Sequence, residues 1–308
     1  MSAPSPSPSP SPSPTPTPTL QPSPAPSATS SATPSSTLSV RVIGIGLLGP
    51  GLVDWTQGSA VLRDPQTWQP QPTVVPPPQR LPATERRRAG TVVKASVVVA
   101  DQALADAPGI DPSRLATVFT SSTGDPLNCH LLCEALAAPQ RLMSPTRFTN
   151  SVHNAAAGYW HIATQSSAPS TSLAAFDASF HAGLLEAAVQ CRHSAKPVLL
   201  VACDVPYPEP LHAVRPLLDV FAVALLLAPL APLAPLEPSP QGRILVLQPG
   251  ADATALRCGH PGLDALCVGI PAAQSLPLLM ALAQMEQGQV FNLKLPTPQM
   301  ERGQVFNF

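Results

Sequence analysis

The sequence predicts an α/β fold in which helices cover both faces of a mixed, five-stranded sheet. Short β-branched and apolar segments alternate along the chain with segments whose apolar residues recur at helical spacing. This alternation favours parallel strands joined by right-handed helical crossovers. Segments 198–202 and 221–227 have no helical segment between them, so we expect one of them to be an antiparallel strand at the edge of the sheet.

Local signals support each expected element in turn. The opening strand, 38–47, is rich in Val and Ile, and the helix predicted over 91–107 stops at Pro108-Gly109. Further strands are expected at 115–120, 172–175, 198–202 and 221–227, with 244–247 as an additional strand candidate. Further helices are expected at 54–62, 125–136, 154–165 and 177–192.

Composition divides the 308 residues into three parts. Residues 1–37 are almost wholly Ser, Pro, Thr and Ala, which cannot bury enough apolar surface to offset the entropy of ordering, so a disordered tail is predicted. Residues 38–229 form the predicted domain, and residues 230–308 read as a Pro-rich linker and C-terminal extension. A near-duplicate at 285–292 and 300–307 predicts either two short strands about a turn or a duplication without structural role.

Composition also limits partners and compartment. The net charge is -1 and 11% of residues are charged, so there is no broad basic surface for nucleic acid. The apolar run 220–236 carries Pro229, Pro232 and Pro235, which favours a buried strand and linker over a membrane span. No Lys or Arg precedes Arg41, which argues against a targeting peptide and predicts a cytoplasmic protein with reduced thiols.

Two motifs point weakly to a cofactor or a metal. Gly44-Ile-Gly46-Leu-Leu-Gly49 fits the dinucleotide pattern, but Pro50-Gly51 follows where the phosphate-binding helix should begin, so a tight turn after a core strand is expected. Cys129, His130 and Cys133 offer zinc ligands within one helical turn, yet no second cluster completes a site. We therefore expect no cofactor and no metal.

Five segments resemble, in order and spacing, parts of the β-ketoacyl synthases. They match the first strand and loop, the second strand, the segment before the nucleophile strand, the nucleophile helix and the following strand, at 42–52, 118–124, 148–158, 177–187 and 197–204. Within that family the chain looks closest to the chain-length-factor-like, non-catalytic subunits of bacterial aryl polyene biosynthesis. The resemblance implies the N-terminal half of a thiolase-like fold. Half of such a fold leaves one apolar face to be covered by a partner.

The resemblance also implies partners and a process. It predicts a heterodimer with a catalytic ketosynthase subunit and contact with an acyl carrier protein, in aryl polyene, polyketide or fatty-acid-type chain elongation. Glu85-Arg-Arg-Arg88 is the one dense charge cluster in the sequence. It is either a solvated helix start or the contact for an acidic acyl carrier protein.

Asp177 stands where the resemblance places the nucleophilic cysteine. A ketosynthase needs a thiolate there, whereas a carboxylate would form a reactive anhydride, so no catalytic residue is expected and Asp177 is predicted to be a helix N-cap. The alternative is an acyl-thioester acyltransferase or decarboxylase, similar to a 3-oxoacyl carrier protein synthase, that uses Asp177 with His153 or His181. A scaffold without any tunnel is a third interpretation.

Three aromatic residues are the candidates for a substrate tunnel. If the chain shapes an acyl tunnel, the bulky rings of Phe148, Phe176 and Phe180 are predicted to form its wall or gate. They would then limit how far the growing chain extends.

Overall fold

The computed structural model describes residues 37–230, 242–250 and 257–296. All of them belong to one compact unit, Ser36–Phe308, while the other unit, Met1–Ser35, lies outside the described residues. The tail predicted over 1–37 therefore also lies outside the described residues, apart from Thr37. The second copy of the near-duplicate, 300–307, lies outside them as well.

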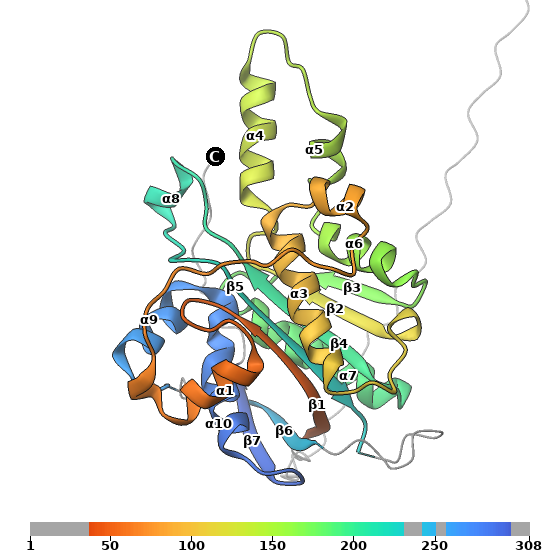
Figure 1. The fold of residues 1–308 in the computed structure, drawn as a ribbon, viewed down its shortest axis with the longest axis vertical. Coiled ribbons are helices and arrows are strands. Elements are labelled where there is room, and N and C mark those ends of the chain that lie inside the picture. Colours follow the sequence, from red (N-terminus) through yellow and green to blue (C-terminus); the bar gives the residue numbers. More distant parts are fainter. Residues whose placement is uncertain (1–36, 231–241, 251–256, 297–308) are drawn as a thin grey trace, which may run out of the picture. The chain divides into compact units, whose positions relative to one another are not determined.

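A mixed sheet of seven strands forms the centre of this unit, with the order β3-β2-β4-β5-β1-β6-β7 (Figure 1). Strands β2, β3 and β4 are parallel to one another, as are β6 and β7, whereas β5 runs antiparallel to both of its neighbours, β4 and β1. The strands are β1 (Leu38–Leu48), β2 (Ala116–Thr120), β3 (Ser170–Leu173), β4 (Val198–Asp204), β5 (Phe221–Ala228), β6 (Arg243–Gly250) and β7 (Val290–Pro296).

The prediction of five strands is wrong, because β6 and β7 extend the sheet beyond β1. Val40 pairs with Leu245 across β1 and β6, and Ile244 pairs with Val290 across β6 and β7. β7 begins inside the first copy of the near-duplicate. The additional strand candidate at 244–247 is confirmed as part of β6, whereas β7 was not predicted as a strand of the sheet. The pairing of both strands depends on the free edge of β1, which no local pattern reveals. The predicted antiparallel pair, β4 and β5, is confirmed, but both strands are central.

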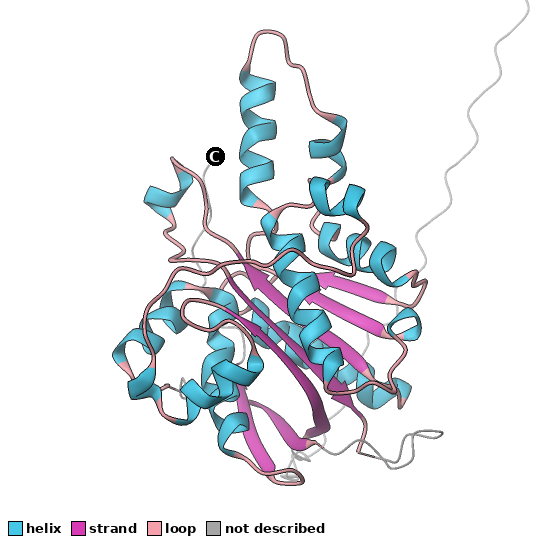
Figure 2. Cartoon of the chain, viewed as in Figure 1, coloured by secondary structure: helices cyan, strands magenta, loops and turns pink. Residues whose placement is uncertain are grey.

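Helices cover both faces of the sheet, as predicted (Figure 2). Among the described residues, no helix has the length and apolar character needed to cross a membrane. The helices are α1 (Trp55–Arg63), α2 (Ala83–Arg88), α3 (Thr91–Ala105), α4 (Pro126–Ala137), α5 (Pro145–Thr149), α6 (Ala155–Thr164), α7 (Ser179–Ser194), α8 (Leu211–Val214), α9 (Pro261–Gly269) and α10 (Leu276–Gln284), with the 3-10 helices η1 (Pro65–Thr67), η2 (Pro112–Arg114) and η3 (Pro271–Ser275).

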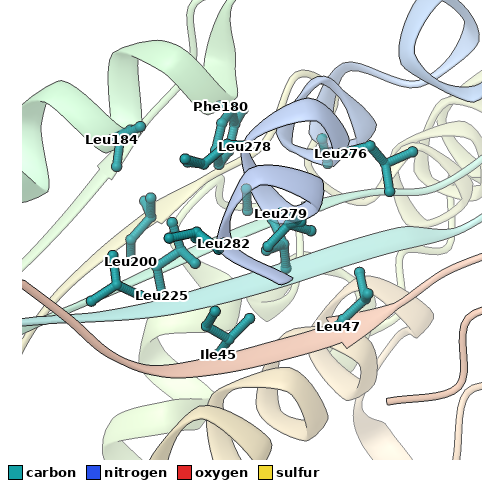
Figure 3. Packing of buried hydrophobic residues seen from close by; sticks show 14 of the residues in the cluster. Ile45, Leu47, Phe180, Leu184, Leu200, Leu225, Leu276, Leu278, Leu279 and Leu282 are labelled. Atoms are coloured by element: carbon teal, nitrogen blue, oxygen red, sulfur yellow. The ribbon is translucent and has the colours of Figure 1, made fainter. Parts of the chain in front are cut away.

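Successive residues of the central strands face opposite sides of the sheet and so supply two separate cores. On β5, Ala224 and Leu226 pack with α3 and α6, whereas Val223 and Leu225 pack with α7, η3 and α10. Figure 3 shows Leu276, Leu278, Leu279 and Leu282 of the C-terminal segment over Leu225 and Leu200. The expectation of an uncovered apolar face is wrong on this side, because η3 and α10 fill it.

The glycines of the dinucleotide-like motif serve packing between a helix and the sheet. Gly44 and Gly46 lie within β1, where α3 crosses the strand. A Cβ atom at either position would come within 1.9 Å of a backbone oxygen, that of Ala103 for Gly44 and that of Val99 for Gly46. The expected tight turn follows later, where Gly49 and Leu52 exchange backbone hydrogen bonds.

Candidate functional site

The candidate site is the turn between β3 and α7, residues 174–178, which we call the elbow. The backbone of Phe176 has a φ of 50°, a left-handed conformation that is uncommon for a bulky residue. Ser179 holds the turn: its hydroxyl accepts from the Ala175 amide at 3.0 Å and donates to the Phe176 carbonyl at 2.6 Å. Strained positions of this kind concentrate at functional sites, and the strain at the elbow falls on Phe176, one residue before Asp177.

Asp177 forms an ion pair with Arg215. The Nη2 atom of Arg215 donates to Asp177 Oδ1 at 2.5 Å and to Ser122 Oγ at 2.8 Å, and the guanidinium carbon lies 3.8 Å from the centre of the Phe176 ring. The N-cap prediction for Asp177 is wrong, because α7 begins at Ser179 with Ala178 as its N-cap and without a side-chain cap. Arginine offers the stronger, charge-assisted partner for the carboxylate.

The two candidate histidines point to other partners within the part of the chain that the structure describes. His153 Nε2 donates to the Ser121 carbonyl at 3.2 Å. His181 packs edge-on against Phe180, with ring centroids 5.4 Å apart. Burial lowers the pKa of His181, so its ring is neutral at pH 7. Among the described residues, no hydrogen bond joins either histidine to Asp177. The acid/base pair is therefore not assembled.

The three aromatic candidates lie in different environments. Phe148 on α5 and Phe176 at the elbow are 63% and 61% exposed. Phe180 on α7 is buried in the core, where Figure 3 places it beside Leu184 and Leu278. The tunnel assignments stay predictions, and of the three rings only Phe176 lies at the elbow itself.

One buried carboxylate was not predicted from the sequence. Asp204, at the carboxyl end of β4, is 1% exposed and accepts hydrogen bonds from the Ser122 amide at 2.7 Å, the Ser121 hydroxyl at 3.0 Å and the Ala272 amide at 2.8 Å. Burial raises the pKa of Asp204. A carboxylate directly after a buried strand was the available signal, because polar groups at the carboxyl ends of parallel strands converge.

A basic cavity of about 530 Å³ lies near the start of α3. Its cationic lining comes from Arg87, Arg88, Lys94 and Arg147, and Asp125 is the carboxylate among its lining residues. Arg87 and Arg88 belong to the charge cluster noted in the sequence and form the last turn of α2. Residues far apart in sequence thus build one positively charged hollow.

The zinc candidate on α4 is not assembled among the described residues. His130 Nε2 lies 3.3 Å from Glu134 Oε1. Nowhere in the described part of the chain do three His, Cys, Asp or Glu side chains lie close enough together to hold a metal ion. Cys129 and Cys133 are exposed free thiols.

The fold is that of the thiolase-like proteins, and comparison with known proteins identifies the family. The model of the β-ketoacyl synthase N-terminal domain matches residues 55–248, more than half of the chain. The chain therefore belongs to the β-ketoacyl synthase family. A comparison with the curated proteins gives no match.

Three solved structures illustrate the likeness. A chain from the complex of a ketosynthase with its chain length factor from Xenorhabdus doucetiae is 28% identical, with a TM-score of 0.54 over 63% of this chain and 80% of that one. Two further structures share the fold at 16% identity. One is a type II polyketide synthase acyl carrier protein in complex with its hexaketide-bound ketosynthase, with a TM-score of 0.52 over 62% of this chain and 63% of that one. The other is the ishigamide ketosynthase/chain length factor, with a TM-score of 0.50 over 61% of each chain. This chain spans less than two thirds of the length of those last two.

Proposed function

We propose that this chain is a non-catalytic, chain-length-factor-like subunit that pairs with a catalytic ketosynthase in aryl polyene or related polyketide or fatty-acid-type chain elongation. The Asp177–Arg215 ion pair carries the proposal. Acyl transfer in this family requires a thiolate at the elbow, and residues 174–178 contain no cysteine. The guanidinium of Arg215 already occupies Oδ1 of Asp177.

The same geometry disfavours the enzyme alternative. An acyltransferase or decarboxylase built on Asp177 needs a histidine within hydrogen-bond reach, about 2.6–3.2 Å. His153 instead bonds to the Ser121 carbonyl, and His181 is packed against Phe180. Asp177 would also have to release Arg215 before it could act on a thioester.

One side of the sheet supports the pairing. β3 is the outermost strand there, and its edge away from β2 has no strand partner among the described residues. The connection through α4 and α5 stands away from the sheet (Figure 1). It exposes Leu136 (51%), Leu142 (80%) and Phe148 (63%). An open strand edge and exposed apolar side chains each favour a protein partner.

The basic cavity supports contact with an acyl carrier protein. Four cationic side chains surround it against one carboxylate, which attracts an acidic partner and speeds its association. This agrees with the contact suggested for the cluster Glu85–Arg88. The compartment that we propose is the cytoplasm, where carrier-protein-bound chains are elongated.

Within the proposal, Phe176 is the favoured tunnel residue. Its ring lies at the elbow, where the resemblance places the acyl acceptor, and it is held by Arg215. Phe148 is a candidate through its exposure beside the proposed pairing side. Phe180 fits a tunnel wall less well, since it packs within the core.

The test compares the purified chain alone with the chain reconstituted with the ketosynthase from its own source. We expect no acyl transfer and no CO₂ release from malonyl carrier protein by the chain alone, and polyene or polyketide products from the pair. Asp177→Asn should leave the product profile largely unchanged. Turnover by the chain alone that disappears in Asp177→Asn, with folding intact, would show that the chain is an enzyme.

A further inference from the structure

We propose that Cys258 and Cys267 form a redox-active dithiol, which a small-molecule disulfide such as oxidised glutathione converts into an intrachain disulfide. The two sulfur atoms lie 3.8 Å apart. A disulfide has an S–S length of about 2.05 Å, so the sulfurs need to approach by about 1.8 Å. At 3.8 Å the two sulfur atoms are already in van der Waals contact, so closure starts from neighbouring thiols.

The backbone around the pair already holds the two thiols together. Gly259, with a φ of 70°, lies in a bend between Cys258 and the start of α9. The Cys258 amide donates to Asp264 Oδ1 at 2.7 Å, which ties the segment before the helix to its first turn. Cys267 lies further along that helix. The turn thus places the two thiols face to face before any oxidation.

A contact outside α9 also fixes this segment. His260 packs edge-on against Trp68, with centroids 5.6 Å apart, and the Trp68 indole donates to the Pro50 carbonyl at 2.9 Å. Gly262 lies directly against the Trp68 ring, where a Cβ atom would come within 2.3 Å. The segment that carries Cys258 is therefore fixed both by Asp264 within α9 and by Trp68 outside it.

The two thiols differ in access, which sets the order of the reaction. Cys258 is 5% exposed, and its hydrogen bond to Cys267 together with burial raises the pKa of its thiol. Cys267 is only partly buried. The Cys267 thiolate attacks one sulfur of the oxidant and releases one thiolate, giving a mixed disulfide. Cys258 then loses its proton, displaces the second thiolate and closes the intrachain S–S bond, so one oxidant molecule becomes two thiols.

The remaining cysteines define the background for a test. Cys191 and Cys203 are buried at 0% and 1% exposure, and burial raises the pKa of Cys191 to about 12, which makes it inert. Cys129 and Cys133 are exposed on α4 and compete for the oxidant. The double variant Cys129→Ser/Cys133→Ser removes that competition and touches neither the elbow nor α9.

The disulfide would strengthen the cover on the α7 face of the sheet. It closes the segment 258–267 around α9, which leads directly into η3, where the Ala272 amide binds Asp204. Closing a loop of this size restricts the unfolded chain, and we expect the melting temperature to rise by about 5 °C on oxidation.

The experiment exposes the Cys129→Ser/Cys133→Ser protein to mixtures of oxidised and reduced glutathione. Intact mass reports loss of about 2 Da for an intrachain disulfide, against the large mass gain of a glutathione adduct. Digestion on the amino side of Asp264 without reductant separates the two cysteines unless S–S links them. We expect the linked peptides, the 2 Da loss and the rise in melting temperature, all reversed by dithiothreitol.

Single variants in the same background supply the controls. Cys258→Ser should leave Cys267 as a lasting glutathione adduct, and Cys267→Ser should stop the reaction, because the buried Cys258 meets the oxidant slowly. The proposal is overturned if the background protein itself accumulates the adduct on Cys267, or keeps both thiols free under conditions that oxidise reference dithiols. Both readouts use the folded parent protein and do not depend on the stability of the single variants.

Discussion

Arg215 joins three segments through one guanidinium group. It bonds the elbow through Asp177 and the loop after β2 through Ser122, and it covers the ring of Phe176. Only a planar group with several donors can serve two acceptors and stack on a ring at once, so lysine is not an equivalent residue here. The same bonds hold the segment between β4 and β5 against the elbow.

The first prediction concerns the Asp177–Arg215 pair. In a double-mutant cycle with Asp177→Asn and Arg215→Ala, we expect a coupling of about 0.5–1 kcal/mol, because the Asp177 side chain is 56% exposed and solvent weakens the pair. A cycle with Arg215→Lys in place of Arg215→Ala should show that lysine retains only part of the coupling energy with Asp177. Urea denaturation measures each value, and strictly additive single effects would mean that the ion pair does not contribute to stability.

The second prediction separates the two elbow-side rings. Phe180→Ala should lower the free energy of unfolding by about 3–5 kcal/mol, since Phe180 is 1% exposed within the leucine-rich core. Phe176→Ala, its matched control, should cost less than about 1 kcal/mol but shift the product length of the reconstituted pair. Chemical denaturation and product analysis test both parts. Equal stability losses in the two variants would contradict the placement of Phe180 in the core.

At the scale of elements, Asp204 connects the sheet to its C-terminal cover. Its carboxylate receives two amide donors and one hydroxyl donor from the loop after β2 and from η3. These bonds are made to the ionised form, yet burial is the larger influence and raises the pKa of Asp204. The folded protein therefore binds the proton of this residue more tightly than the unfolded chain does.

The third prediction follows from that shift. Asp204 contributes to the free energy of unfolding through this shift. The contribution is fully present below the pKa of an aspartate in the unfolded chain, about 3.9, and is lost as the pH rises through the pKa of Asp204 in the folded protein. Asp204→Asn removes this titration but turns its amide towards a backbone N–H donor, at a cost of about 1–3 kcal/mol. The stability difference between wild type and variant should shrink from pH 4 to pH 7 in urea denaturation. A difference that grows over this range would show that the folded pKa is lowered.

The fourth prediction concerns the C-terminal cover as a set of elements. Ending the chain at residue 230 removes Leu276, Leu278, Leu279 and Leu282, which are 0–2% exposed, together with β6 and β7. We expect the truncated protein to aggregate, because a large apolar surface of the sheet becomes exposed. Deletion of residues 1–36, whose Ser- and Pro-rich composition predicts no packed core, is the control and should leave the melting temperature unchanged. A soluble, cooperatively melting truncation would show that the cover is dispensable.

At the scale of the whole molecule, helices cover both faces of the sheet, so the proposed pairing has to use another surface. The fifth prediction places that surface on the connection through α4 and α5. Leu142→Asp and Phe148→Asp should each abolish co-purification with the ketosynthase, because an unpaired charge would be buried in an apolar interface. Val268→Asp on α9, at a residue 86% exposed, is the matched control and should pair normally. Loss of pairing in Val268→Asp alone would move the interface to α9.

Local sequence patterns determined much of this protein. The strands β1 to β5, the helices α1, α3, α4, α6 and α7, the antiparallel β4–β5 pair and the family were all predicted, because periodicity and short motifs act within ten to twenty residues. Asp177 was singled out from the sequence, but its predicted role as an N-cap was wrong, because its carboxylate pairs with Arg215 instead.

Only the tertiary structure decided what these local elements meet. Arg215 lies 38 residues from Asp177 and 93 from Ser122, and the amide that binds Asp204 lies 68 residues further on. The edge of β1 that receives β6, and the core that receives α10, likewise exist only once distant strands have paired. Hydrogen bonds and apolar burial depend on distance in space, and no local pattern encodes which distant groups will satisfy them.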